Sequence, residues 1–313
     1  MDKLIELRNK IETFYLKHER IGGFIIRMLL TFLCLLITRN IIDFNKVLSS
    51  FWVIALISVV CGFIPVRFLP LVIIAYTLFH VFTLSMALGI VTLMVLVVMY
   101  LLFYRFAPEY AVILMILPLA IWLKVPILPV MVLAVLGPAV SSVTVIFGTI
   151  YYFLTHFLNA NAATFAGTTG TLEFTKVELL VEGVFTNKEF LYTVAILFVV
   201  FMIVHFLKRI NVNHSIEIAL AVGTGAYIIL TLGCELALHT LTSSKLLGYV
   251  IGGLIAGALA IIILNFWYPL DYVRTETVEF EDDEYNYYVK AVPKASFEKE
   301  RVQIKRINKR KVL

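Results

Sequence analysis

Long runs of apolar residues without a charged side chain are the feature that most limits how this sequence can fold. Phe190 to Leu207 and Leu246 to Tyr268 are two of these runs. A helix needs about 20 apolar residues to cross a bilayer, and the runs are too long and alternate too little for barrel strands. We therefore predict an all-α polytopic membrane protein. Its composition agrees, because 61% of the residues are hydrophobic and 15% are charged, whereas soluble domains are roughly half apolar and a quarter charged.

The basic residues indicate how the chain crosses the membrane. The N-terminal segment, Arg67, Arg105, Lys208-Arg209 and the basic C-terminal end fall on one side, which the positive-inside rule assigns to the cytoplasm. We predict a transmembrane helical domain at residues 21–268 in a bacterial cell (plasma) membrane, with both termini cytoplasmic and about eight to ten passages. Residues 159–189 would form an external loop that contains a surface helix.

The apolar run from Leu71 to Phe103 is too long for a single span. At 1.5 Å for each residue, it exceeds a bilayer core of about 30 Å considerably. We therefore divide it into two short spans near His80 to Ser85. His80 then lies at a helix end, where we expect it to meet lipid headgroups or backbone carbonyls.

Prolines interrupt the apolar stretch from Ala107 to Leu158. They are Pro108, Pro118, Pro126, Pro129 and Pro138. Proline removes a backbone donor, so a broken helix persists at membrane depth only where protein or a water-filled cavity satisfies the freed groups. Because Arg105 is assigned to the inside and Asn159 to the outside, the stretch must cross an odd number of times. It makes either one crossing plus a re-entrant segment or three short crossings.

This broken stretch carries the candidate solute cavity. Lys124 is its one charged residue at mid-stretch, and Gly137, Ser141, Ser142 and Thr144 form a small polar cluster. If the stretch is re-entrant, the lysine and the cluster would face one another across a cavity suited to a small anion or polar solute. If it makes three crossings, Lys124 is a turn residue at the membrane interface.

Glu235 and His239 are a candidate polar pair. They lie four residues apart and so share one helical face, where they could hold or pass a proton. A competing interpretation places both at the outer end of their helix, wetted by headgroups. The nearby Lys245 favours this second interpretation, because it indicates that the interface is close.

Four glycines in the last apolar run predict close helix packing. Gly248 and Gly252, and then Gly253 and Gly257, each have the small-xxx-small spacing that lets two backbones approach. We expect this helix to pack inside the bundle or at a dimer contact.

Both ends of the chain differ from the membrane domain. Residues 1–20 carry apolar residues at helical spacing, which predicts an amphipathic helix at the cytoplasmic interface or, equally, a solvated lead-in. Residues 269–313 contain two β-prone runs, RTETVEF and YNYYVKAV, separated by EDDE. These predict a small cytoplasmic β-hairpin followed by a basic tail.

The predicted hairpin is the candidate partner-binding segment. An isolated two-stranded hairpin is marginally stable, so this one should dock on the membrane domain, a second copy or a protein partner. The side chains proposed for this contact are Phe280, Tyr285, Tyr287 and Tyr288. The basic termini should meet anionic lipid headgroups, and we expect no nucleic acid to bind.

Two segments carry a resemblance. LDYVRTETVEFEDDEYNYYVKAVPK, together with KVPILPVMVLAVLGPAVSSVTVIFGTIYYFL, resembles a group of largely uncharacterised multi-pass membrane proteins of Gram-positive anaerobic bacteria. The likeness extends over most of the chain, and the C-terminal FEDDEYNYYVKAVPK is its most specific part. The resemblance implies a multi-pass architecture and a bacterial membrane, and it carries no activity over to this chain.

The sequence lacks the common catalytic and nucleotide-binding motifs, which makes an enzymatic function unexpected. It contains no P-loop, zincin, nucleophile-elbow or dinucleotide motif, and Cys34, Cys61 and Cys234 have no metal-ligand spacing. We expect no enzyme, catalytic residue, metal or cofactor. Two classes stay open: a permease or channel-like transporter of a small solute or ion, and a non-transporting scaffold or subunit of an envelope complex that recruits a partner through the tail.

Overall fold

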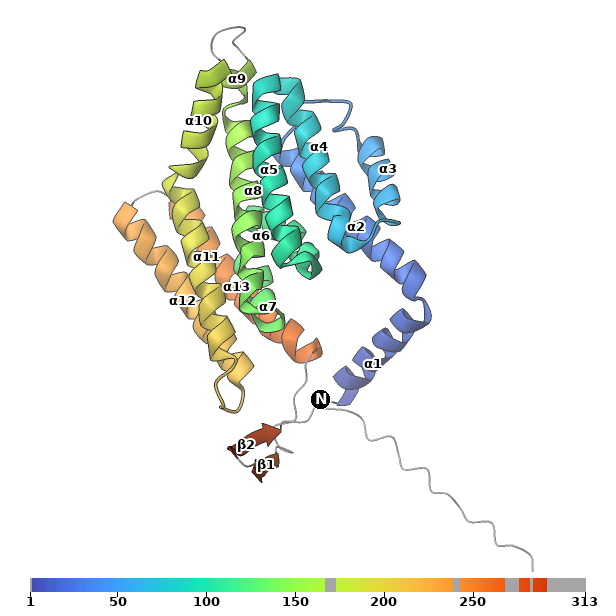
Figure 1. Ribbon diagram of the computed structural model, residues 1–313, viewed down its shortest axis with the longest axis vertical. Coiled ribbons are helices and arrows are strands. Elements are labelled where there is room, and N and C mark those ends of the chain that lie inside the picture. The colour runs from blue at the N-terminus through green and yellow to red at the C-terminus, as the bar shows by residue number, and fades with distance from the viewer. Residues whose placement is uncertain (1, 167–172, 239–242, 268–275, 282–283, 292–313) are drawn as a thin grey trace, which may run out of the picture. The chain divides into compact units, whose positions relative to one another are not determined.

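The computed structural model describes residues 2–166, 173–238, 243–267, 276–281 and 284–291 (Figure 1). It is 83% helical, with a single small sheet among these residues. The chain divides into two units, residues 19–262 and the two ends together, residues 1–18 and 263–313. The first unit is the membrane domain. This confirms the predicted all-α polytopic class.

Seven helical segments among the described residues are long and apolar enough to cross a membrane. They contain α2 (Glu19–Ile41), α4 (Leu69–Leu84), α5 (Met86–Phe106), α8 (Ser142–Ala160), α11 (Lys188–Leu207), α12 (Ser215–Leu238) and α13 (Ser243–Trp267). The short 3-10 helices η1 (Val66–Phe68) and η3 (Ala139–Ser141) lengthen α4 and α8 at their starts. The predicted division of the run at residues 71–103 is confirmed, because α4 ends at Leu84 and α5 begins at Met86.

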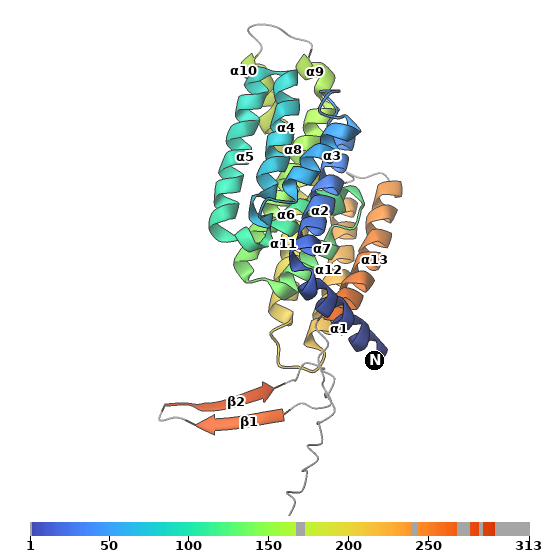
Figure 2. The same ribbon diagram turned by 90° about the vertical axis from the view of Figure 1, so that its right-hand side faces the viewer.

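Three apolar helices are shorter. They are α3 (Phe51–Cys61), α6 (Ala111–Trp122), which follows η2 (Pro108–Tyr110), and α7 (Ile127–Leu136). At 1.5 Å for each residue, α3 is about 16 Å long, α6 about 18 Å and α7 about 15 Å, against a bilayer core of about 30 Å. α3 packs along α2 and returns the chain to the start of α4 (Figure 2). Among the described residues the segments of spanning length number seven, and the eight to ten passages stay a prediction.

The α6–α7 pair enters and leaves the membrane domain on one side. The start of α6 packs with Phe103 at the end of α5, and the carbonyl end of α7 contacts His205 and Lys208 at the end of α11. We call this side the Lys208 side, and the opposite one, where α11 begins after Asn187, the Asn187 side. The pair therefore begins and ends on one side, a geometry that both arrangements left open by the sequence share, the re-entrant segment and the three short crossings.

The segment expected to be a loop with a surface helix is mostly helical. α8 continues to Ala160 and is followed by α9 (Ala162–Ala166) and α10 (Glu173–Phe185). Leu180 and Val184 of α10 are buried in one cluster with Leu154 and Leu158 of α8. Asn187 then caps α11, since its side-chain oxygen accepts hydrogen bonds from Glu189 N at 2.8 Å and Phe190 N at 3.3 Å.

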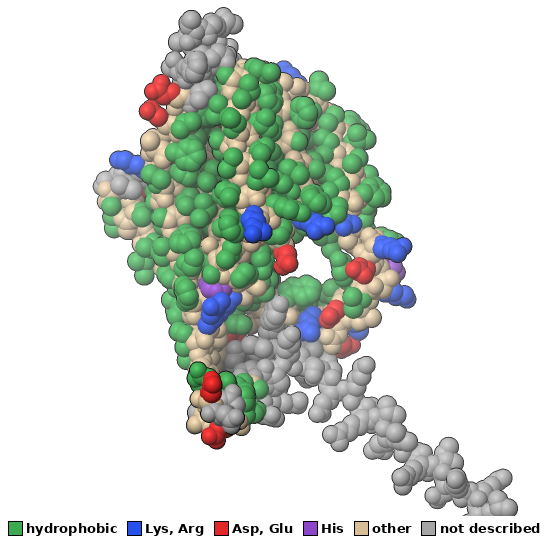
Figure 3. All heavy atoms as spheres, in the orientation of Figure 1, with side chains coloured by type: hydrophobic (Ala, Val, Ile, Leu, Met, Phe, Trp, Pro, Cys, Tyr) green, Lys and Arg blue, Asp and Glu red, His purple; other side chains and the backbone are tan. Residues whose placement is uncertain are grey.

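Hydrophobic side chains cover the face of the membrane domain shown in Figure 3, and charged ones are few there. Many large apolar residues of its helices are exposed, among them Leu56, Met94, Ile229 and Leu254. Contiguous exposed apolar surface of this extent is abnormal for a soluble monomer. This surface is therefore suited to contact with the hydrocarbon core of a bilayer.

The ends of the chain form two small elements. α1 (Asp2–Lys17) leaves Leu7, Ile11 and Phe14 exposed, as expected for a helix that lies on a membrane surface. β1 (Glu276–Glu281) and β2 (Asn286–Ala291) pair antiparallel, with Val278 opposite Val289 and Phe280 opposite Tyr287. This confirms the predicted β-hairpin. The basic tail beyond residue 291 lies outside the described residues.

Candidate functional site

Lys124 occupies the turn between α6 and α7 in a left-handed backbone conformation, with φ of 63°. Val125 N donates to Ala120 O at 2.8 Å and Lys124 N donates to Ile121 O at 3.0 Å. These two bonds define a Schellman motif, and Lys124 fills the position where glycine is usual. In this conformation any residue with a side chain is less stable than glycine. The backbone of the turn therefore does not explain why a lysine stands there.

The turn packs into the groove of α13 that two of the predicted glycines create. A Cβ atom on Gly252 would come 1.9 Å from the Lys124 carbonyl oxygen, and one on Gly248 would come 2.9 Å from Lys124 Nζ. Gly253 and Gly257 instead face Tyr227 and Thr224 of α12. The two glycine pairs therefore contact different partners, the turn between α6 and α7 and the helix α12.

The other end of α7 is held by a lysine. Lys208 Nζ donates to Ala134 O at 2.7 Å, to Val135 O at 2.8 Å and to Gly137 O at 3.3 Å. A cation at a helix C-terminus meets its unsatisfied carbonyls and the negative end of the dipole. Burial, and then the neighbouring Arg209 charge, lower the pKa of Lys208. The lysine is thus a side-chain cap that α11 supplies to α7.

A histidine on α11 adds to this cap. His205 is fully buried and its Nδ1 lies 3.2 Å from Ala134 O. The ring stacks on Phe201 with centroids 5.7 Å apart. Its Nε2 is buried and has no hydrogen-bond partner, so the residue is oriented by one hydrogen bond and by packing.

The predicted small polar cluster lies at this same Lys208 end. Ser141 and Thr144 are fully buried, Ser142 is nearly so, and the Ser141 hydroxyl donates to Pro138 O at 2.7 Å. Lys124 precedes α7 and the cluster follows it, so the length of α7, about 15 Å, separates them. Lys124 and the cluster therefore lie at opposite ends of α7, and a solute cavity between them stays a prediction.

The predicted polar pair is described only in part. Glu235 is half-buried in α12, and His239 lies outside the described residues. Among the residues that the structure describes, no three His, Cys, Asp or Glu side chains gather to hold a metal ion.

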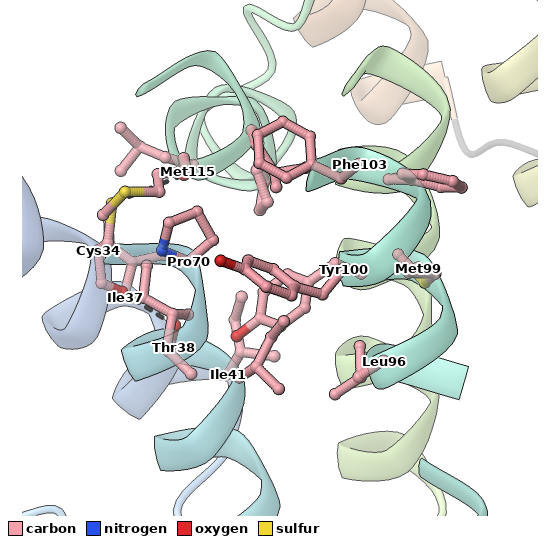
Figure 4. Close-up of a pocket in the computed structure, with 17 residues that line it drawn as sticks. Cys34, Ile37, Thr38, Ile41, Pro70, Leu96, Met99, Tyr100, Phe103 and Met115 are labelled. Atoms are coloured by element: carbon pink, nitrogen blue, oxygen red, sulfur yellow. Dashed lines mark hydrogen bonds between the residues drawn. The ribbon is translucent and has the colours of Figure 1, made fainter. Parts of the chain in front are cut away.

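A cavity of about 50 Å³ lies between five helices of the membrane domain (Figure 4). α2, α4, α5, α6 and α8 each contribute lining residues, among them Ile37, Pro70, Leu96, Met115 and Tyr151. Pro70 stands at the start of α4, and Pro118, inside α6, also lines the cavity. No acidic or basic side chain lines it. By the space that a buried water needs, it has room for about four water-sized groups.

The polar side chains around this cavity already have hydrogen bonds within the protein. Thr38 Oγ1 donates to Cys34 O at 2.9 Å, and Cys34 Sγ donates to Met115 O at 3.5 Å. The Tyr151 hydroxyl lies 2.7 Å from Thr77 Oγ1. Tyr100 donates a long hydrogen bond of 3.4 Å to Arg67 O. An occupant would therefore meet an apolar wall.

The β-hairpin presents one apolar face. Phe280 and Tyr287 stack with ring centroids 4.7 Å apart, and both are exposed, as are Val278 and Val289. The register places these four residues on one face, because alternate residues of a strand share a face. Of the predicted contact residues, Tyr285 is exposed just before β2. Tyr288 pairs with Glu279, so it belongs to the opposite face of the hairpin and not to the apolar one.

Sequence reasoning missed the α7 cap and the five-helix cavity. Lys208 was interpreted only as a basic flank of its span, and His205 was not singled out. A lysine placed directly after an apolar helix signals topology in most cases, so the sequence gives no separate sign of its role. The cavity is lined by ordinary apolar residues from five helices, which share no local pattern.

No protein-family model, curated protein or solved structure matches this chain. The fold by itself defines its class, which is a multi-pass helical membrane protein.

Proposed function

We propose that the membrane domain is a permease-like carrier of a small solute, and that the five-helix cavity is its solute site. The observation that carries the proposal is a cavity between five helices that Pro70 of α4 and Pro118 of α6 line. Pro118 lies inside α6 and removes one of its backbone hydrogen bonds, and helices weakened in this way beside a cavity are common in transport sites. The uncharged lining favours a solute over an ion.

The α6–α7 pair supports the same proposal. The turn of the pair and the end of α7 are each held by a separate contact, the Gly252 groove at Lys124 and the Lys208 cap. A carrier needs an element of this kind, because alternating access requires a part that moves against a fixed frame. We place the carrier in a bacterial plasma membrane with the Lys208 side in the cytoplasm, since Arg67, Arg105 and Lys208 lie on that side.

The test begins with binding. Purified protein is screened against a panel of uncharged, ionic and amphipathic small molecules, and a true ligand raises the thermal unfolding midpoint. Flux of the ligand is then measured in proteoliposomes. We expect Leu119→Trp, which fills the cavity from α6, to abolish both signals. Ile116→Trp is the matched control, because Ile116 is also half-buried on α6 but does not line the cavity.

Two results would contradict the carrier. One is a panel in which no solute changes the unfolding midpoint. The other is unaltered binding and flux in a folded Leu119→Trp protein.

The exposed hairpin face favours a second candidate, a scaffold that recruits a protein partner. Four exposed apolar side chains on one face of a two-stranded hairpin are best explained by a surface that covers them. Crosslinking in cells would compare the full chain with Phe280→Ser and with Glu279→Gln, which alters the alternate face. The scaffold predicts partner loss with the first variant alone. Identical partner profiles for all three would count against it.

A further inference from the structure

An open apolar groove runs along the outside of the five-helix cavity. It lies between α5, α8 and α10 and is lined by Met94, Val98, Leu102, Ile150 and Phe185, among others. Met94, Val98 and Leu102 are exposed on the lipid-facing side of α5. No polar side chain lines the groove. In a bilayer, a surface of this kind is in contact with hydrocarbon.

The groove and the cavity share two residues. Met99 of α5 and Phe147 of α8 line both of them, and both side chains are half-buried. Met99 lies next to Tyr100 and one turn from Leu96 and Phe103 on the cavity side of α5 (Figure 4). Only these side chains are common to both walls, so they form the partition between lipid and cavity. Methionine is flexible and unbranched, which suits a side chain that must move aside.

The cavity itself rejects polar occupants. Its hydroxyl and thiol groups are hydrogen-bonded within the protein, and its remaining wall is apolar. A water or an ion would lose hydrogen bonds on entry and recover few. A hydrocarbon chain would lose no hydrogen bonds, since it leaves one apolar surrounding for another, and dispersion contacts with the wall would offset the conformational entropy that it loses.

We propose that the cavity receives the end of a single hydrocarbon chain of a membrane lipid, which enters sideways from the bilayer between α5 and α8, past Met99 and Phe147. The inference rests on the proposed function, because it names the substrate class of the same site. The volume of about 50 Å³ admits only the end of a chain. The rest of the chain lies in the groove, so the substrate is amphipathic and reaches its site without crossing water.

The test uses the full chain in nanodiscs of phosphatidylcholine that carries a photoreactive diazirine at the end of one acyl chain. After illumination, the labelled residues are located by mass spectrometry. We expect adducts on the cavity residues Cys34, Met115 or Tyr151, besides those on outward residues such as Met94. Adducts confined to the outward residues would overturn the proposal, since they show ordinary annular lipid.

Three variants test the entry path. Met99→Trp should reduce the inner adducts about tenfold and leave the outer ones unchanged. Leu102→Trp, which alters the groove but not the partition, should leave both unchanged. Phe147→Ala should increase the inner adducts, and this gain does not depend on whether the tryptophan variants fold well. Inner adducts that respond to neither Met99→Trp nor Phe147→Ala would refute the lateral path.

A second arm identifies the source of the chain. The same diazirine on a free octanol molecule is added to nanodiscs of unlabelled lipid. Inner labelling by the free alcohol, with none by the labelled lipid, would overturn the commitment to a lipid chain. Inner labelling by the lipid in a protein that shows no flux in proteoliposomes would contradict the carrier and leave the chain site standing.

Discussion

Replacing Lys208 by methionine should release the carbonyl end of α7. Methionine has a similar length and keeps the packing of the side chain, but it cannot donate the hydrogen bonds to Ala134, Val135 and Gly137. The carbonyls of Val135 and Gly137 would lose this partner, and that of Ala134 would keep only the His205 ring. We therefore expect local opening of residues 134–141 rather than loss of the whole fold.

The magnitude follows from these three bonds. Hydrogen bonds to a charged group contribute roughly 1.5 kcal/mol or more each, which gives about 4 to 5 kcal/mol in total. Burial of the ammonium, which also lowers the Lys208 pKa, offsets part of this sum, and water can reach the half-buried site. The local structure is then less stable by about 1 to 3 kcal/mol. Because 1.4 kcal/mol is a tenfold change in an equilibrium constant, residues 134–141 should be open roughly 5 to 150 times more often.

Hydrogen exchange read by mass spectrometry measures this opening directly. Peptides that cover residues 134–141 should exchange faster in Lys208→Met by that factor, while peptides of α4 and α5 keep their wild-type rates. Arg209→Ala is the matched control, since it removes a neighbouring, exposed cation. Equal exchange in Lys208→Met and Arg209→Ala would refute the cap.

Two further predictions concern the turn between α6 and α7. Gly252→Ala should destabilise the protein by about 3 kcal/mol, because its Cβ would lie 1.9 Å from the Lys124 carbonyl oxygen. Gly225→Ala, with no atom within 4 Å of its Cβ, should be neutral or stabilising by up to about 1 kcal/mol; equal unfolding midpoints for the two variants would disprove the contact. Lys124→Gly should stabilise the turn by about 1 kcal/mol relative to Lys124→Ala, because only glycine adopts a φ of 63° without cost. If chemical unfolding ranks Lys124→Ala as the more stable of the two, the backbone is not strained there.

The span helices could be predicted because their physical cause is local. An uninterrupted apolar run must form a helix in lipid, whatever surrounds it, so α5 and α11 follow from composition and length. The same holds for the proline breaks that separate α6 from α7. The glycine spacing in α13 correctly indicated a close backbone approach. It could not indicate that the partner of Gly248 and Gly252 is a turn, because any small backbone would fit.

The parts that sequence did not predict depend on distant contacts. His80 was expected to meet headgroups or backbone carbonyls, yet it is fully buried, and its Nδ1 accepts a hydrogen bond from Asn45 N at 3.2 Å. The cause is a connection, residues 42–50, that folds over the end of α4. Likewise, Lys208 finds its partners more than 70 residues earlier in the chain. No window of sequence contains both members of either pair.

The two attachments of the α6–α7 pair have a consequence for biosynthesis. Lys208 on α11 and Gly252 on α13 both follow the pair in the sequence, Gly252 by more than a hundred residues. At about 5 to 20 residues per second, the ribosome needs roughly 5 to 25 s after Lys124 to make Gly252. During that time the pair has neither its cap nor its groove. Its final position is therefore reached late, after the helices on either side of it have entered the membrane.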